Sequence, residues 1–255
     1  MRSNMQNSAI TLLSLNMHQD YHLETVTALI TERATDVICL QETQKIFVED
    51  IARRLGYDFL FSLRTYNASR DDGAELREEG VALIWHPSLR LRDSSVIAYR
   101  EKDQPVVKRL TDDPNDVRRT MLVATLLRGV QVFRIGTTHF TWTPDGSASE
   151  EQCGDMHRML SALEVFHDEY GIVFCGDFNA PRGGEIFQMM SDVYTDNLPR
   201  SIVTTLDQAL HRAAPIFHAV DSIFCTKEYA VSDVAVVDGV SDHMALFAKV
   251  SKSVC

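Results

Sequence analysis

Residues 171–179 read Gly-Ile-Val-Phe-Cys-Gly-Asp-Phe-Asn, an apolar run that ends in two polar side chains. The run from Gly171 to Cys175 is short and apolar and contains two β-branched residues, which is typical of a buried strand. Asp177 and Asn179 follow directly, so both would lie where that strand ends. Groups at strand ends are held by the sheet and still reach solvent, and catalytic residues often lie there. This stretch therefore predicts a strand that presents an acid and an amide to a cleft.

Other apolar runs end in the same way, in acidic, amide or imidazole side chains. These are Asn16 after residues 12–15, Gln41 and Glu42 after residues 37–40, and His139 after residues 135–138. Two further candidates are Asp221, inside the apolar run 220–225, and the pair Asp242 and His243, just before the last predicted strand. Taken singly, Glu42 is more typical of a helix cap or a solvated loop. Asp221 is different, because an unpaired charge in an apolar strand is very costly and must meet a basic partner or hydrogen-bond donors.

Strands and helices alternate along the chain, which is typical of an α/β protein. We expect strands at residues 9–15, 36–40, 57–63, 80–85, 120–127, 130–138, 171–175, 220–225, 231–237 and 244–250, with a tight hairpin at Arg128 and Gly129. We expect helices at residues 23–34, 46–55 and 149–167. Residues 66–79 and 100–116 are polar and charged, and we expect them to be weakly structured. Since strands continue on both sides of these stretches, we expect one domain over residues 1–255, with a core over about residues 9–250.

The composition is that of a folded protein with a substantial core. Of the 255 residues, 45% are hydrophobic and 24% are charged, which excludes a disordered chain. No apolar run approaches the roughly 18 residues of a membrane span, and the first run is too short for a signal peptide. We therefore expect a cytoplasmic protein. The five cysteines form no Cys-x-x-Cys pair, which disfavours a zinc site or a disulfide framework.

The acidic balance of the chain limits its partners. Asp and Glu number 36 against 25 Lys and Arg, giving a formal net charge of -11. Proteins that hold duplex DNA without sequence preference neutralise many phosphates with Lys and Arg, so that class is disfavoured. A local basic cluster could still attract a polyanion, and its members are Arg100, Lys102, Lys108, Arg109, Arg118 and Arg119.

Six segments, taken in order, resemble the endonuclease/exonuclease/phosphatase superfamily, the deoxyribonuclease-I-like proteins. They are Leu15-Asn16, Leu40-Gln41-Glu42-Thr43, Thr138-His139-Phe140, Gly176-Asp177-Phe178-Asn179, Val220-Asp221-Ser222-Ile223-Phe224 and Ser241-Asp242-His243. The resemblance spans Asn16 to Val250, nearly the whole chain. It implies a four-layer α/β sandwich of two mixed β-sheets flanked by helices. It also implies a metal-dependent phosphoesterase whose site lies at one end of the sandwich.

The resemblance also assigns the metal ligands and a general base. Glu42 would be the principal ligand of Mg²⁺, or of Mn²⁺ in its place, and Asn16 and Asp242 would complete the metal site, either as direct ligands or by holding the ligands. Such hard cations prefer oxygen ligands. Some branches carry a further metal-assisting acid two residues after Asn16, where this chain has His18. Asp177 would orient and deprotonate the attacking water, with a histidine as the alternative general base.

The remaining site residues would bind the phosphate or transfer protons. By the same resemblance, Asn16, His139 and Asn179 would contact phosphate oxygens. His243 would contact the phosphate as a cation or transfer a proton, while Asp221 accepts a hydrogen bond from its other ring nitrogen. His139 and His243 would then lie on opposite sides of the phosphate, suited to acid and base roles. Histidine at position 139 also disfavours the abasic-site endonuclease branch.

Several further side chains lie close to these motifs in sequence. Trp142 and Tyr66 could stack on a planar ring, although partial burial on a loop explains them equally well. Arg182 could touch the substrate phosphate, but an exposed loop arginine is more often solvated. Thr205 and Asp207 lie near the place where some members carry a threonine or asparagine that supports the site.

The sequence leaves three functions open. The leading one is a phosphodiesterase, either a nuclease acting at a nucleic acid end or an enzyme acting on a small phosphate-containing molecule. The alternative is a phosphatase of a small or lipid-derived phosphomonoester. A non-catalytic binding module is a minor alternative, because it would be expected to have lost Glu42, Asp177 or His243, and all three are present. We expect a monomer whose partner is its phosphate-ester substrate.

Overall fold

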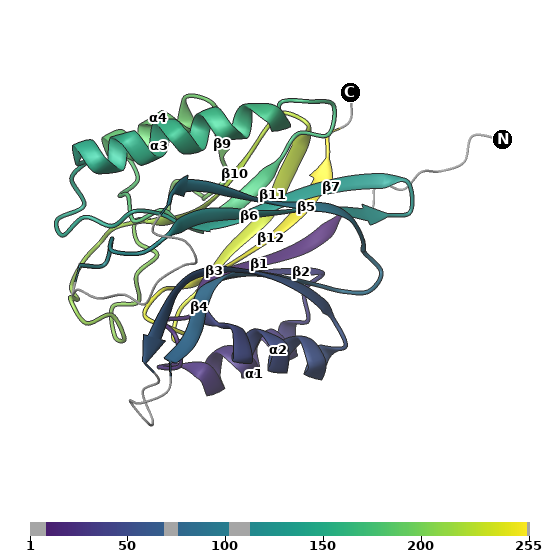
Figure 1. Cartoon of the computed structure of the whole chain (residues 1–255), viewed down its shortest axis with the longest axis horizontal. Coiled ribbons are helices and arrows are strands. Elements are labelled where there is room, and N and C mark those ends of the chain that lie inside the picture. Colours follow the sequence, from purple (N-terminus) through teal and green to yellow (C-terminus); the bar gives the residue numbers. More distant parts are fainter. Residues whose placement is uncertain (1–8, 69–75, 102–112, 254–255) are drawn as a thin grey trace.

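The computed structural model describes residues 9–68, 76–101 and 113–253, and Figure 1 shows two β-sheets packed between two pairs of helices. The first sheet has the strand order β11-β12-β1-β2-β4-β3, with bounds β1 Ile10–Asn16, β2 Val37–Gln44, β3 Asp58–Ala68, β4 Leu76–Trp85, β11 Tyr229–Val237 and β12 Ala245–Lys252. The second has the order β5-β6-β7-β8-β10-β9, with bounds β5 Arg90–Arg100, β6 Arg119–Arg128, β7 Gln131–His139, β8 Val173–Asp177, β9 Thr195–Asp196 and β10 Asp221–Cys225. The helices are α1 Leu23–Arg33, α2 Lys45–Leu55, α3 Glu150–Leu163 and α4 Glu185–Ser191, with a 3₁₀ turn at Glu164–Phe166.

Three apolar clusters hold the layers together. One lies between the sheets and joins residues such as Leu12 and Val37 of the first to Phe133 and Ile223 of the second. The other two lie under α1 and α2 and under α3 and α4. Strands covered on both faces read as continuous apolar runs, and β8 is buried along its whole length. The predicted four-layer sandwich of two mixed sheets is confirmed (Figure 1).

Some element predictions were wrong. β3 continues to Ala68 and β4 begins at Leu76, so residues 66–68 and 76–79 belong to strands rather than to a weakly structured stretch. Three elements were not predicted: β5, α4 and β9. β5 is a sheet edge with mostly exposed residues, so it lacks the apolar alternation that marks a strand, and the other two are short. The hairpin turn lies at Gly129 and Val130, one residue later than predicted.

The predicted basic cluster can be checked only in part. Lys102, Lys108 and Arg109 lie outside the described residues. Arg118 pairs with Glu101 at 3.0 Å, Arg100 pairs with Asp155, and Arg119 is buried, so these three do not form a free basic face. Across residues 9–68, 76–101 and 113–253, no helix has the length and apolar character needed to cross a bilayer.

The register of the sheets places the candidate residues side by side. In the parallel pair β7–β8, His139 lies opposite Asp177, and in the antiparallel pair β8–β10, Asp177 lies opposite Asp221. In the first sheet, Asn16 of β1 lies opposite Gln41 of β2. Asn16, His139 and Asp177 are the last residues of their strands, whereas the sequence placed them just beyond. Strand pairing alone therefore gathers acids and an imidazole from distant segments.

The packing of β8 against β7 depends on Gly176. This residue has a φ of +145°, and a Cβ atom there would lie 2.0 Å from the carbonyl oxygen of Thr138. Left-handed backbone alone costs a non-glycine residue about 1–2 kcal/mol. We expect Gly176→Ala to lower the free energy of unfolding by more than that, because the clash is with backbone. Urea denaturation measures the loss.

Gly129→Ala is the matched control for this prediction. Gly129 also has a positive φ, +61°, but apart from its chain neighbours no atom lies within 4 Å of the point that a Cβ atom would occupy. The control therefore carries the strain of a left-handed helical backbone without the clash. Equal losses of stability in the two variants would contradict the account of Gly176.

Candidate active site

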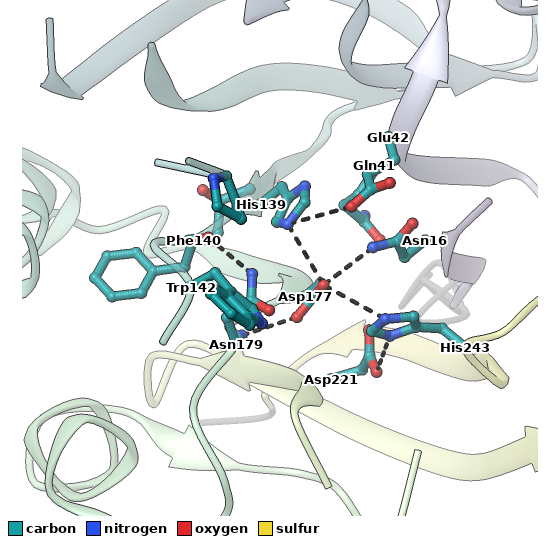
Figure 2. A network of polar contacts seen from close by, with 12 residues as sticks. Asn16, Gln41, Glu42, His139, Phe140, Trp142, Asp177, Asn179, Asp221 and His243 are labelled. Atoms are coloured by element: carbon teal, nitrogen blue, oxygen red, sulfur yellow. Dashed lines mark hydrogen bonds and ion pairs between the residues drawn. The ribbon is translucent and has the colours of Figure 1, made fainter. Parts of the chain in front are cut away.

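Polar side chains from both sheets converge at one end of the sandwich (Figure 2). The first sheet contributes Asn16 and Glu42, and the second contributes His139, Asp177 and Asp221, while His243 comes from the loop before β12. All of these except Glu42 are buried. The structure therefore brings the predicted residues together in one place.

The carboxylate of Asp177 lies at the centre of this group (Figure 2). Its Oδ1 accepts a hydrogen bond from the Asn179 N–H at 2.8 Å, and its Oδ2 accepts one from Asn16 Nδ2 at 3.0 Å. The Nε2 atoms of His139 and His243 lie 3.6 and 3.7 Å from the same Oδ2. One carboxylate oxygen thus faces two imidazoles.

The environment of Asp177 favours its protonated form. Burial raises the pKa of Asp177 to about 7; the charge of His243 opposes the shift and that of Asp221 reinforces it. The hydrogen bonds from Asn179 and Asn16 also act to lower this pKa. A group whose pKa lies near neutrality can both take and release a proton at physiological pH. Asp177 therefore has the electrostatics of a general base.

The imidazole of His243 is held by a carboxylate. Its Nδ1 donates a hydrogen bond to Asp221 Oδ2 at 2.9 Å, and the same oxygen accepts one from Thr205 Oγ1 at 2.6 Å. Burial lowers the pKa of His243, but Asp221 and then Asp177 outweigh it and raise the pKa well above its ordinary value. Asp221 therefore has the basic partner that its place in an apolar strand requires, and Thr205 supports the pair.

The imidazole of His139 has the opposite surroundings. Its Nδ1 lies 2.8 Å from Nη1 of the buried Arg64. Burial lowers the pKa of His139 well below its ordinary value, and the charges of Arg64 and Arg119 add to the effect. The two imidazoles, which the sequence placed on opposite sides of the phosphate in acid and base roles, therefore differ in their surroundings: those of His139 lower its pKa and favour the neutral ring, and those of His243 raise its pKa and favour the cation.

Glu42 owes its direction to a break in the regular pairing of β2. The register with β4 shifts between Leu40 and Thr43, and Glu42 has a φ of 46°. Such irregularities re-aim a side chain. Its Oε1 lies 3.7 Å from His139 Nε2, and no described residue donates a hydrogen bond to this carboxylate. Its oxygens can therefore serve a hard cation.

The two other predicted ligands both contact His18. Asn16 Oδ1 accepts a hydrogen bond from the backbone N–H of His18 at 3.0 Å, and Asp242 Oδ2 lies 3.1 Å from His18 Nδ1. Both Glu42 and Asp242 line the same cavity. His18 thus occupies the place of the additional acid and pairs with a predicted ligand.

A second group of side chains has the spacing of a metal site. One ligand atom each of Asp177, Asp221 and His243 lies within 4.8 Å of the others. However, Asp221 Oδ2 already accepts two hydrogen bonds, and each oxygen of Asp177 accepts one. Because Glu42 has no such partner among the described residues, we regard it as the better ligand for a hard cation.

Trp142 stands at the rim of the site on a fixed backbone (Figure 2). Asn115 Nδ2 donates to the Trp142 carbonyl at 2.8 Å, and Asn115 Oδ1 accepts from the Trp142 N–H at 3.0 Å. Arg119 links Asn115 to the end of β7, because it donates to Asn115 Oδ1 and to the carbonyl of His139. Trp142 is 38% exposed and is therefore available to a ligand.

The site opens into a cavity of about 460 Å³. Its wall includes Glu42, Arg119, Trp142, Asp177, His218 and His243. Tyr66 and Arg182 do not line it. Arg182 is instead bound to Asp196 and to the carbonyls of Leu198 and Pro199, so its suggested contact with phosphate is wrong.

Sequence reasoning missed Arg64, Arg119 and Asn115 as parts of the site. A signal for Arg64 was available, because it follows the apolar run Phe59–Leu63 and a charge in such a run needs a partner, as argued for Asp221. Asn115 gives no signal of its own. Its role depends on the approach of a loop more than 20 residues away, at Trp142.

The chain matches one protein family over most of its length, and its fold is similar to that of several solved structures. Residues 13–243 match the model of the Endonuclease/Exonuclease/phosphatase family. The endonuclease/exonuclease/phosphatase from Bacteroides vulgatus has a TM-score of 0.71 at 19% identity, covering 96% of this chain and 100% of that one. The human Nocturnin catalytic domain with bound sulfate anion has a TM-score of 0.71 at 19% identity, with 98% and 95% covered. The mannosyl-6-phosphatase from Bacteroides thetaiotaomicron has a TM-score of 0.68 at 14% identity, with 94% and 99% covered. A search of curated protein sequences finds no match.

A substitution of the buried Asp177 can show whether this residue acts in the reaction or only stabilises the fold. Asp177→Asn keeps the shape of the side chain and removes an ionisable group whose raised pKa shows that the fold disfavours its charge. We expect turnover of a phosphate ester to fall by about 10²–10⁴-fold, the usual contribution of a general base. The melting temperature, measured by calorimetry, should change little, because relief of the buried charge offsets the loss of the hydrogen bond from Asn16 Nδ2.

Asp155→Asn is the matched control. Asp155 is equally buried, but its carboxylate pairs with Arg100 and Arg158, so its replacement should lower the melting temperature. A large fall in the melting temperature of Asp177→Asn would show that Asp177 is structural.

Proposed function

Because this chain belongs to the Endonuclease/Exonuclease/phosphatase family, we propose that it is a divalent-metal-dependent phosphoesterase that hydrolyses a phosphodiester. The observation that carries the proposal is the position of Asp177 Oδ2, within 3.7 Å of the Nε2 atoms of two histidines. In-line attack on phosphorus needs a base for the water and donors for the phosphoryl oxygens close together. The convergence on Asp177 meets that requirement.

The proposed mechanism gives Asp177, His243 and His139 different tasks. Asp177 takes a proton from the attacking water, and hydrogen bonds from Asn16 and the Asn179 N–H fix the direction of its carboxylate. His243, charged and held by Asp221, stabilises the phosphate and can give a proton to the leaving oxygen. His139 donates from Nε2 to a phosphoryl oxygen.

The donor set fits a hard cation. Glu42 would hold Mg²⁺, or Mn²⁺ in its place, and Asn16 and Asp242 would assist it. This fit rests on the carboxylate of Glu42, which faces the cavity and has no hydrogen-bond donor among the described residues. When bound, such a cation polarises a phosphoryl oxygen and neutralises developing charge.

The charge of the cavity wall favours a diester over a monoester. Glu42, Asp145 and Asp242 line it, while Arg64 of the same wall is paired with Glu79 and Arg119 is buried. A monoester dianion meets more repulsion from these carboxylates than a diester monoanion does. The net charge of -11 likewise favours a compact substrate or a nucleic acid end over a long duplex.

Hydrolysis of a small or lipid-derived phosphomonoester is the second candidate. Its support is the shared fold with the mannosyl-6-phosphatase of Bacteroides thetaiotaomicron, which at 14% identity concerns the fold alone. A non-catalytic binding module is the third candidate, and the presence of every proposed catalytic side chain argues against it.

A direct assay distinguishes these candidates. The protein is incubated with bis(p-nitrophenyl) phosphate and, separately, with p-nitrophenyl phosphate, each with Mg²⁺ and with a chelator. We expect Mg²⁺-dependent release of nitrophenol, faster from the diester. Faster release of nitrophenol from the monoester would favour the phosphatase. Equal release of nitrophenol with the chelator would refute metal dependence. If neither ester released nitrophenol and neither single-stranded DNA nor RNA was cleaved, the binding module would be favoured.

The assignment of Glu42 gives a separate prediction. Glu42→Ala should abolish hydrolysis at low Mg²⁺ and recover part of it at high Mg²⁺, because the loss of a ligand weakens cation binding. Turnover is measured as a function of Mg²⁺ concentration. Asp145→Asn is the control, since it removes one carboxylate from the same cavity without touching the proposed ligand. Full activity of Glu42→Ala at low Mg²⁺ would refute the assignment.

A further inference from the structure

The contact between Arg64 and His139 fixes where the imidazole carries its proton. Nη1 of Arg64 lies 2.8 Å from Nδ1 of His139, and both side chains are buried. A guanidinium has only donors. Nδ1 must therefore be the acceptor and cannot bear a hydrogen, which leaves the ring proton on Nε2.

The alternatives to this tautomer all lose the contact. An imidazolium would set its Nδ1–H against an N–H of the guanidinium. A ring turned by 180° would offer Arg64 a C–H group instead of a nitrogen. In the observed orientation, Nε2 faces Asp177 Oδ2 at 3.6 Å and Glu42 Oε1 at 3.7 Å, where the substrate phosphate is proposed to bind.

Arg64 reaches His139 because of an irregularity in the first sheet. Leu63 pairs with Gly80 and Thr65 with Glu79, so Arg64 is the extra residue of a bulge between β3 and β4. Bulges bend a strand and re-aim its side chains, and they are frequent beside active sites. The bulge directs Arg64 out of the first sheet toward a residue of the second.

The guanidinium is fixed from its other side. Nη2 of Arg64 donates to Oε1 of Glu79, whose carboxylate is fully buried, and Asn67 Nδ2 donates to the other oxygen. Glu79 neutralises the charge of Arg64 without touching the imidazole. The backbone of His139 is held as well, since Arg119 and the Tyr99 hydroxyl both donate to its carbonyl at 3.2 Å.

We propose that Arg64 is a positioning residue that holds His139 as a neutral Nε2–H donor to a phosphoryl oxygen. The donor role rests on the proposed function; the tautomer does not. His139 then acts as a fixed dipole and transfers no proton. His243 differs at the same ring atom, because its Nδ1 donates to the carboxylate of Asp221.

The tautomer is tested in the free protein without any substrate. Long-range ¹H–¹⁵N correlation spectra of protein labelled with ¹⁵N-histidine distinguish protonated from unprotonated ring nitrogens. The chain has nine histidines, and the signals of His139 are those missing from His139→Gln. We expect a protonated Nε2 and an unprotonated Nδ1 at pH 7. A proton on Nδ1, or on both nitrogens, would overturn the proposal.

The positioning role is tested by two substitutions of Arg64. Arg64→Met removes the donors, whereas Arg64→Lys keeps a group that can only donate. Loss of a partner that orients a functional histidine typically costs about 10–100-fold in activity, and we expect a loss of kcat in that range for Arg64→Met, with an altered tautomer in the spectrum. Arg64→Lys should recover part of both.

Arg134→Met is the control for loss of a buried arginine. Arg134 is 8% exposed, as is Arg64, and it binds Asp168 and the carbonyl of Gly171, outside the cavity wall. Its kcat per folded molecule should be unchanged. If Arg64→Met matched this control in kcat and kept the wild-type tautomer, the proposal would be wrong.

The donor role is tested on His139 itself. A glutamine amide can donate a hydrogen bond but cannot act as an acid or base at neutral pH. His139→Gln should therefore retain more kcat than His139→Ala, and equal losses would refute the donor role. If the wild-type protein hydrolyses no phosphate ester, the proposed function fails, while the spectrum still decides the tautomer.

Discussion

The buried carboxylate of Asp177 is the constraint on which the rest of the structure depends. A charge in the interior is very costly unless donors surround it, and these donors come from both sheets. Asn16 belongs to the first sheet, whereas the Asn179 N–H belongs to the loop that follows β8 of the second sheet. The site is therefore complete only when the two sheets are packed, so that the apolar core between them and the polar cluster at its end form together.

The sequence predicted the members of the site better than it predicted their arrangement. Asn16, His139 and Asp177 could be found because each ends an apolar run, and Asp221 because a charge in such a run needs a partner. Their neighbourhood depends on which strands pair and in which register. A single strand has the same two-residue period whatever its partner, so only the resemblance to a known family supplied the four layers.

Arg64 shows why the remaining part of the site escaped prediction. Alternation along a strand predicts which face a side chain occupies only while the pairing stays regular. The bulge at Arg64 breaks that regularity, and it forms only because β3 pairs with β4 in this register. Glu42 depends on a comparable break in β2. Two side chains that shape the chemistry of the site are thus placed by local irregularities that the sequence pattern does not encode.

Under the proposed function the site admits both a cation and a phosphate, and the opposite partners of the two histidines balance its charge for both. If carboxylates held both rings, the cluster around Asp177 would gain another negative charge and would repel the phosphate. If both rings were cations beside Arg64, the cluster would repel the metal. With Asp221 on His243 and Arg64 on His139, one ring supplies positive charge and the other supplies only a dipole. Glu79 neutralises the charge of Arg64 through Nη2, the nitrogen that does not contact His139. His139 is therefore kept neutral without an uncompensated charge in the interior.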